Sequence, residues 1–456
     1  MKFIDFISLK SLLPSILLGS MSCLSMAATI EVTPEQSLQA VLDQAQAGDV
    51  VRLAPGVYKG QFRVQTPITL EGPESRQAII QGTGKGRTLA IEAEDVTVRH
   101  LTVKHSGRSL PDMDAGIFLD KKAKRALVEF NDVLDNSVGV YVWGADDAIV
   151  QHNRIVGDKT LRVNERGNGV TLWNAPGAKI IENDISYGRD GIFSNTSHHN
   201  VFKGNKFENL RYAVHYMYTN DSEVSHNVSF GNEIGYALMF SERLTVTDNV
   251  ATDSTAQGIM LNYTNNSTIS GNVVVNAEKC LFAYNANVNK ILNNHFEGCD
   301  IGIHYTAVGQ DNHIANNAFV HNQTQVKYVG TRYMEWSYNN RGNYWSDNSA
   351  FDLNADGLAD TAYRPNGIVD QIVWRAPTAQ LLLNSPAVSV VKWAQTQFPA
   401  ILPGGIVDSH PLMEIPSTPA LRHWRAYDKK QAWCLDWCQE QWVRDPATKR
   451  FYKEAQ

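Results

Sequence analysis

The chain contains 456 residues, of which 43% are apolar and 19% are charged, proportions that are ordinary for a soluble protein. With 41 Lys and Arg against 47 Asp and Glu, its formal net charge is −6, which gives no general electrostatic reason to bind nucleic acid. We therefore expect no nucleic-acid partner, although a local patch could still contact a partner embedded in a membrane.

The start of the chain has the pattern of an export signal. Lys2 and Lys10 are basic, residues 12–24 are mostly apolar or small, and Ser25-Met26-Ala27 offers small residues at the two positions that signal peptidase reads. The sequence therefore predicts a cleaved signal peptide over residues 1–27 and a mature chain exported to the periplasm. The apolar run is too short to be a membrane anchor.

Residues 28–328 are predicted to form one body that starts with a short helix. The segment 37–53, SLQAVLDQAQAGDVVRL, is typical of a helix that leads into a strand, and Pro55-Gly56 marks a turn into the next strand. Further strands are expected at 68–72 and 96–99. The helix would form an N-terminal cap over the end of the stack, whose strand edges are otherwise unpaired.

Asparagine recurs in a fixed frame through the middle of the chain, two residues before a position that is usually apolar. A second series, in step with the first, places a small residue before an aliphatic one. A period near 22 with β-branched runs and Asn or Gly turns is typical of a solenoid. The asparagines are Asn131, Asn153, Asn183, Asn205, Asn227, Asn249, Asn272, Asn294 and Asn317. The pairs are Gly116-Ile117, Gly139-Val140, Gly169-Val170, Gly191-Ile192, Ala213-Val214, Ala237-Leu238, Gly258-Ile259, Cys280-Leu281 and Gly302-Ile303.

This period predicts a right-handed parallel β-helix, an all-β fold in which each coil has three short strands and three turns. Leucine-rich repeats share the period but need a leucine frame that this sequence lacks. Coils would stack about 4.8 Å apart, so each Asn could pass side-chain hydrogen bonds to the next. The interval from Asn153 to Asn183 is 30 residues rather than 22, and we expect residues 157–167 to form a loop at one corner.

The repeat stops after about Tyr328. Residues 329–416 carry Trp, Pro and Gly in irregular order and are predicted to form an irregular C-terminal cap. Residues 417–456, which are rich in Lys, Arg and Trp, are predicted to form a separate tail that is helical or partly ordered.

Four cysteines follow the signal peptide, too few for a disulfide scaffold in so long a chain, so stability is expected to come from packing and hydrogen-bond ladders. Cys280 occupies a small-residue position of the repeat and is expected to face inward. Cys434 and Cys438 would face one way on a helix. There they could bind a soft metal, form a disulfide or be unrelated thiols.

Several segments together resemble one known protein family. In the central coils they are YAVHYMYTNDSEVSHN at 212–227, YALMFSE at 236–242 and GIMLN at 258–262. Beyond the repeat they are GNYWSD at 342–347, DLNADGLADTAYRPNGIVDQ at 352–371 and FPAILPGGIVDSHPLM at 398–413. These segments resemble the NosD family of periplasmic maturation factors for nitrous oxide reductase. The resemblance runs from about residue 30 to 415, so the tail with Cys434 and Cys438 is not part of it.

The resemblance implies a function in the periplasm that is not enzymatic. Members of the family work with an ABC transporter, made of a membrane subunit and a cytoplasmic ATPase, on which they sit. They take part in assembling the copper–sulfide cluster of nitrous oxide reductase, an enzyme of denitrification. A membrane-anchored copper chaperone is a further implied partner.

The alternative function is that of a polysaccharide lyase or epimerase, since those enzymes share the β-helix and a fold alone does not decide between functions. Their chemistry needs carboxylates together with Lys, Arg or His groups on one outer face. Asp190 beside Arg189 is the best such pair in the sequence and is isolated.

One outer face of the predicted solenoid carries soft metal ligands. Counting from the small residue of each pair, positions +2 and +4 should point outward. Position +2 then places His215, Met239 and Met260 on successive coils, and Met217 stands at +4 beside His215. Imidazole and thioether groups suit Cu(I), so these four residues form a candidate Cu(I) site. The alternatives are a hydrophobic docking face and a surface that a C-terminal loop covers.

A second candidate metal site lies in the predicted C-terminal cap. Asp352, Asn354, Asp356 and Asp360, with Gly357, place oxygen side chains at alternate positions of a turn, which suits Ca²⁺. The glutamate that closes an EF-hand loop is missing. A plain loop of Asx turns is an equally good interpretation.

Overall fold

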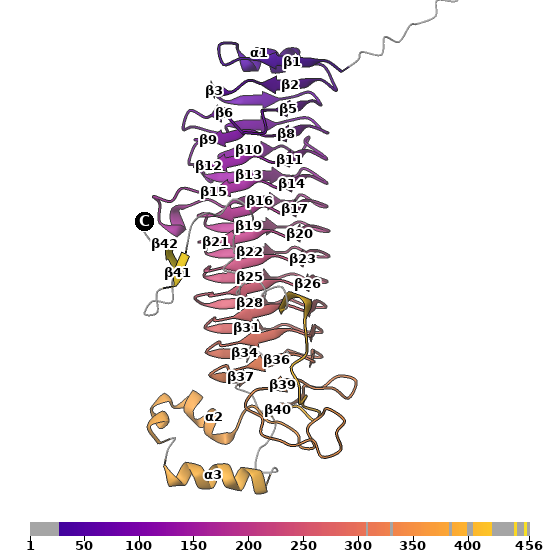
Figure 1. Cartoon of the computed structure of the whole chain (residues 1–456), viewed down its shortest axis with the longest axis vertical. Helices are drawn as coiled ribbons and strands as arrows, with labels where there is room; N and C mark the ends of the chain where they lie inside the picture. The colour runs from indigo at the N-terminus through magenta and orange to yellow at the C-terminus, as the bar shows by residue number, and fades with distance from the viewer. Residues whose placement is uncertain are drawn as a thin grey trace, which may run out of the picture.

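The computed structural model describes residues 27–306, 309–328, 332–382, 385–398, 405–421, 442–444 and 451–453. The predicted signal peptide, except for Ala27, and the pair Cys434 and Cys438 lie outside these residues. Most of the described chain forms one elongated stack of coils (Figure 1). No helix in the described part is long and apolar enough to cross a bilayer.

Coils of the stack contribute strands to three parallel sheets, which we name A, B and C. Sheet A contains, in order, β1 (Thr29–Val32), β2 (Val50–Leu53), β5 (Thr69–Glu71), β8 (Thr97–Arg99), β11 (Leu127–Glu129), β14 (Ile149–Gln151), β17 (Lys179–Ile181), β20 (Val201–Lys203), β23 (Glu223–Ser225), β26 (Thr245–Thr247), β29 (Thr268–Ser270), β32 (Lys290–Leu292) and β35 (His313–Ala315). Sheet B contains β3 (Gly56–Lys59), β6 (Ala78–Gln81), β9 (Thr102–Lys104), β12 (Asp132–Leu134), β15 (Arg154–Val156), β18 (Asp184–Ser186), β21 (Lys206–Glu208), β24 (Val228–Phe230), β27 (Val250–Thr252), β30 (Val273–Val275), β33 (His295–Glu297), β36 (Ala318–Val320) and β39 (Tyr344–Trp345). Sheet C contains β4 (Phe62–Val64), β7 (Leu89–Ile91), β10 (Ala115–Leu119), β13 (Val138–Trp143), β16 (Val170–Trp173), β19 (Asp190–Asn195), β22 (Tyr212–Met217), β25 (Ile234–Met239), β28 (Gln257–Asn262), β31 (Lys279–Tyr284), β34 (Ile301–Thr306) and β37 (Thr324–Tyr328). The predicted parallel β-helix is confirmed, while its right-handed sense stays a prediction.

The strands form because short runs of β-branched residues alternate with other residue types, a pattern that suits a half-buried strand. In sheet C, Val140 is aligned in turn with Val170, Ile192 and Val214, and all four are fully buried. Their side chains belong to one hydrophobic cluster inside the stack. The intervening Tyr141 is only partly buried, so the two faces of the sheet alternate along each strand.

The predicted asparagine column is confirmed. The side-chain amide of Asn205 donates to Oδ1 of Asn227 at 3.0 Å, and it also donates to the carbonyl of Ile180 in the preceding coil. The same amide-to-amide contact runs from Asn131 to Asn317 and continues for one further step to Asn343. Because these side chains are buried, such satisfied hydrogen bonds are what allows the column to exist.

Asp408 ends this ladder. Its Oδ2 accepts the backbone N–H of Asn343 at 2.7 Å and the indole N–H of Trp345 at 2.8 Å. Each asparagine donates to the next residue of the column, so the residue at the end needs only to accept, as a carboxylate does. Burial raises the pKa of Asp408, although these hydrogen bonds oppose the rise. The carboxylate follows β40 (Gly405–Val407), which pairs with β38 (Tyr333–Glu335), so a late segment closes the C-terminal end of the stack.

The predicted N-terminal helix is present as α1 (Leu38–Gln44), at the end of the stack (Figure 1). The Ser37 hydroxyl accepts the N–H of Ala40 at its first turn. Leu38 and Leu42 belong to the hydrophobic cluster, so the helix packs against the first coils.

The opposite end differs from the predicted irregular cap. It contains α2 (Ile368–Arg375) and α3 (Pro386–Gln397), which lie beyond the last coils (Figure 1). The sequence signal for α3 was Ser385, which caps the helix, followed by proline at the first helical position. The predicted corner loop at 157–167 does connect β15 to β16, and it contains a short 3₁₀ turn.

Cys280 and Cys299 form a disulfide that the sequence analysis missed. Cys280 faces inward as expected, and both cysteines are buried. Their separation of 19 residues is close to one coil, which brings both to one corner of the stack. The expectation that packing and ladders alone stabilise the coils is therefore incomplete.

The beginning of the predicted tail packs against the outer face of sheet B. Ala420 and Leu421 form a small hydrophobic cluster with Val250 in β27 and Val273 in β30. Residues up to 421 thus belong to the packed structure rather than to a separate segment. They cover sheet B and not the outer face of sheet C. The only other described parts of the tail are β41 (Trp442–Arg444) and β42 (Phe451–Lys453), which pair in antiparallel.

Candidate functional site

The outer face of sheet C contains the four residues of the predicted Cu(I) site, but one of them is not in the predicted frame. Met239 is aligned with Met217 on the neighbouring strand, whereas Ala237 stands between His215 and Met260. The predicted +2 position of Met239 is therefore wrong, because Met239 belongs to the +4 column.

Met239 was assigned to the wrong column because two neighbouring residue pairs both fit the small-then-apolar pattern of the repeat. Gly235-Tyr236, not Ala237-Leu238, is aligned with Ala213-Val214. The Tyr236 ring takes an inward aliphatic position because its hydroxyl reaches the backbone carbonyls of Asn227 and Val250, at 2.9 and 3.0 Å. The 22-residue spacing from Ala213 would have identified Gly235.

The corrected frame gives two adjoining outward columns on β22, β25 and β28. One contains His215, Ala237 and Met260, and the other contains Met217 and Met239. His215 and the three methionines are partly exposed, but Ala237 has no exposed surface. Because Ala237 points outward, its burial means that longer neighbouring side chains close over it.

His215 belongs to a buried polar cluster with Asp190 and Arg211. The Asp190 carboxylate accepts two hydrogen bonds from the Arg211 guanidinium, at 2.8 and 2.7 Å, and lies 2.9 Å from Nδ1 of His215. Burial alone would raise the pKa of Asp190, but the hydrogen bonds from His215 and Arg211 outweigh it and hold the pKa below its usual value. Arg189, the neighbour of Asp190 in the sequence, has its Nε buried without a hydrogen bond to any described group, so the guanidinium that pairs with Asp190 is that of Arg211.

The His215 ring is held on several sides. The Phe193 ring lies 4.9 Å away in a tilted contact, and the Tyr212 ring meets it edge-on at 5.0 Å. With Nδ1 facing Asp190, Nε2 faces the opposite way and makes no hydrogen bond to a described residue. The imidazole is therefore fixed, with one nitrogen left for a ligand.

Aromatic rings border the methionine columns at the next corner. Tyr218, Phe240 and Tyr263 follow the ends of β22, β25 and β28, and their rings stack with centroids 5.4 and 5.1 Å apart. Each has a positive φ near 50°, which turns the chain there. Tyr218 and Tyr263 are exposed. The methionines thus lie beside an exposed aromatic ladder.

The Asp352 loop has the arrangement of Asx turns. The Asp352 carboxylate accepts the N–H groups of Asp356 and Gly357, and Asn354 Oδ1 accepts that of Asp356 as well. Asp360 accepts the N–H of Leu353 at 2.7 Å. The backbone hydrogen bonds to these oxygens account for the loop without a cation, so the structure gives calcium no support.

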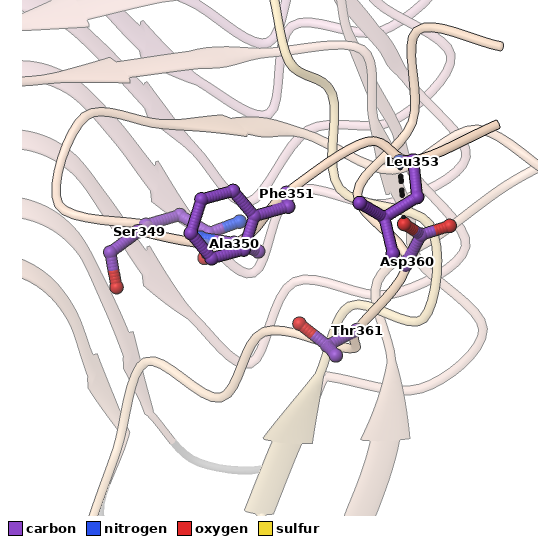
Figure 2. A pocket seen from close by; sticks show the side chains of 7 residues that line it. Ser349, Ala350, Phe351, Leu353, Asp360 and Thr361 are labelled. Atoms are coloured by element: carbon purple, nitrogen blue, oxygen red, sulfur yellow. Dashed lines mark hydrogen bonds between the residues drawn. The ribbon is translucent and has the colours of Figure 1, made fainter. Parts of the chain in front are cut away.

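A shallow hollow of about 360 Å³ lies next to this loop and is shown in Figure 2. Its lining is neutral except for Asp360, and that carboxylate is already bonded to Leu353. Phe351 and Leu353 at its rim are largely exposed. We find no chemistry in this hollow beyond that of the turn itself.

Within the described residues, no group of three or more His, Cys, Asp or Glu side chains is placed to hold a metal ion. Methionine sulfur can also bind soft metals, and sheet C presents three methionines on its outer face. A metal site on this face would therefore depend on sulfur and a single imidazole.

Known proteins are similar to this chain over most of its length. Residues 151–350 match the family described as periplasmic copper-binding protein (NosD), and residues 25–242 match a family of unknown function, DUF1565. A Stutzerimonas stutzeri protein named "Probable ABC transporter binding protein NosD" is 42% identical over 385 residues, covering 81% of this chain and 88% of the relative. A Pseudomonas aeruginosa protein of the same name is 41% identical over 379 residues, covering 80% and 88%.

A solved structure of similar architecture is a mannuronic acid specific polysaccharide family 6 lyase from human gut microbiota. It is 13% identical with a TM-score of 0.44, and the match covers 66% of this chain and 83% of the lyase. At this identity and score, nothing about chemistry follows from the likeness.

Proposed function

The chain belongs to the NosD family of periplasmic copper-binding proteins, and on that premise we propose that it helps to assemble the copper–sulfide cluster of nitrous oxide reductase together with an ABC transporter. In this role it is a binding and delivery protein and not an enzyme. Its proposed partners are the membrane subunit of the transporter with its ATPase, a copper chaperone and the reductase.

The observation that carries the copper part of this proposal is the outer face of sheet C. An outer face of a solenoid is expected to be polar, yet this one presents three thioethers and an imidazole on neighbouring strands. Soft thioether ligands and imidazole suit Cu(I). Parallel strands that are hydrogen-bonded on both sides hold such ligands on a rigid surface.

The same face is suited to contact with the protein that donates the copper, since a handover requires contact. The exposed ladder of Tyr218, Phe240 and Tyr263 lies directly beside Met217 and Met239. Exposed apolar patches often mark partner sites, and methionine adapts to varied partners.

A pair of variants in cells tests the proposal. Met239→Ala with Met260→Ala, replacing the wild-type gene, should lower the activity of nitrous oxide reductase by impairing its cluster. Met413→Ala, which removes an exposed thioether far along the chain, serves as the control. Normal maturation of the reductase in the double variant would overturn the role of this face.

Contact is tested separately. Tyr218→Ser with Tyr263→Ser should weaken co-purification of the chain with the copper chaperone and leave the fold intact. Tyr333→Ser is the matched control, because Tyr333 is equally exposed but lies on β38. Unchanged co-purification would remove the aromatic ladder from the interface.

The Asp190–Arg211–His215 cluster favours a second candidate, a lyase or epimerase that acts on uronic acid polymers. A carboxylate, a guanidinium and an imidazole are groups that such chemistry uses. However, Asp190 is fully buried and its charge is paired with Arg211, which ties up both groups. A screen of the purified chain against polyuronates decides the matter, since turnover would overturn the proposal of a delivery protein.

A further inference from the structure

We propose that sheet C holds one Cu(I) ion as cargo over Ala237, ligated by Nε2 of His215 and the thioethers of Met239 and Met260. This site rests on the copper-handling function proposed above and specifies where that function is performed. The proposed set leaves out Met217, which the sequence analysis included. Its Met239 lies on the same strand as Ala237 and not in the column of His215, where the sequence had placed it.

The first argument is the spacing around Ala237. His215 and Met260 stand one strand before and one strand after it, so their Cα atoms are roughly 10 Å apart. Met239 is two residues further along the same strand as Ala237, roughly 7 Å away on the same face. Ala237 has the short side chain among these, and it lies at the point toward which the three longer ones can converge.

The second argument is the burial of Ala237. His215 and Met260 point outward from this sheet and are partly exposed. Ala237, which lies between them in the same column, has no exposed surface. The neighbouring side chains therefore already lean over it. His215 and Met260, two of the three ligands, are the residues aligned with Ala237 on either side.

The third argument is the orientation of His215. Its Nδ1 lies 2.9 Å from the Asp190 carboxylate, on the preceding strand. Histidines that bind metals usually donate their other ring N–H to a carboxylate, which fixes the tautomer and the direction of the free nitrogen. Here Nδ1 faces Asp190, so Nε2 lies on the opposite side of the ring and makes no hydrogen bond to a described residue. Asp190 acts as a positioning residue.

The ligand set suits a transient cargo. One imidazole and two thioethers are neutral and soft, so they select Cu(I) over harder divalent ions. The Asp190 charge is paired with Arg211 and does not reach the ion directly. Three ligands on an open face leave one side of the ion free for a ligand of the donor or acceptor protein.

The test is an anaerobic competition titration of the mature chain with the Cu(I)–bicinchoninate complex. The wild type should take up one Cu(I) per chain. Met239→Leu with Met260→Leu keeps the side-chain volume but removes both sulfurs, and should weaken binding at least tenfold. Met413→Leu is the thioether control and should bind as the wild type does.

A second variant enlarges the side chain at position 237 and changes no ligand residue. Ala237→Leu should abolish binding, whereas Thr306→Leu, which places the same side chain on the same face at β34, should not. Asp190→Asn keeps an oxygen acceptor for Nδ1–H and should stay within threefold of the wild type. Asp190→Leu should lose at least tenfold while remaining folded.

The outcomes separate this site from the function on which it rests. Cu(I) binding by the wild type that neither Met239→Leu/Met260→Leu nor Ala237→Leu reduces would overturn the site and leave the copper-handling function standing. No Cu(I) uptake by the wild type would overturn both. Equal losses in Asp190→Asn and Asp190→Leu would remove Asp190 from its positioning role.

Discussion

Two outer faces of the coil stack, on sheets B and C, carry apolar columns at the same height, yet only one of them is closed by the described chain. On sheet B, Val250 and Val273 are covered by Ala420 and Leu421. On sheet C, Met217 and Met239 stay partly exposed beside an aromatic ladder. The chain therefore covers the apolar column on sheet B with its own C-terminal segment. The face left uncovered is the one that presents the methionine thioethers and the imidazole of His215.

The largest expected effect concerns the covered face. Leu421→Ala should lower the free energy of unfolding by about 2 kcal/mol, because it removes a buried side chain and leaves a cavity against β27 and β30. Chemical denaturation measures the change. Cu(I) binding should be unaffected, and a loss of binding in this variant would mean that the two faces are not independent.

The asparagine column, the corner loop and the outward position of His215 could all be predicted from spacing alone, since they follow a local period. The disulfide, the contact of Leu421 with Val250 and the end of the ladder at Asp408 could not. Each of these contacts joins segments that come together only when the coils have stacked, so no local spacing in the sequence indicates it. Met239 was misplaced for a different reason, because Ala237-Leu238 and Gly235-Tyr236 fit the same local pattern and only a hydrogen bond of the Tyr236 hydroxyl distinguishes them.

A smaller effect on the open face is a pH dependence at His304, two strands beyond Met260. Burial, helped by Lys327 and Lys279, lowers the pKa of His304 from 6.5 to about 4. Between these values the unfolded chain binds a proton that the folded chain does not. Stability from His304 is thus full above pH 6.5 and is lost as the pH falls toward 4.

Thermal melts at pH 5 and pH 7 test this dependence. The fall in melting temperature from pH 7 to pH 5 should be smaller in His304→Gln than in the wild type. An equal fall in both proteins would show that His304 titrates normally and that its environment is not as buried as we describe.

A still smaller change in stability is expected for the methionines of the open face. Met239→Ala with Met260→Ala should alter the free energy of unfolding by less than about 1 kcal/mol, since surface substitutions usually stay near ±0.5 kcal/mol each. This contrasts with Leu421→Ala on the closed face. Denaturation curves of the two variants give the comparison directly, and a loss as large as that of Leu421→Ala would make the methionines structural.

No effect is expected at the Asp352 loop. Because its oxygens are bonded to its own backbone, removal of calcium with EGTA should leave the melting temperature of the mature chain unchanged. A fall in melting temperature that Asp356→Ala abolishes would restore the calcium interpretation.

Copper K-edge absorption spectroscopy of the mature chain, loaded anaerobically with one equivalent of Cu(I), tests the central claim most directly. The proposed site over Ala237 predicts one nitrogen and two sulfur scatterers around copper, the nitrogen from His215 and the sulfurs from Met239 and Met260. A spectrum without sulfur scatterers, or one unchanged in Met239→Leu/Met260→Leu, would contradict the claim that the open face of sheet C holds the copper.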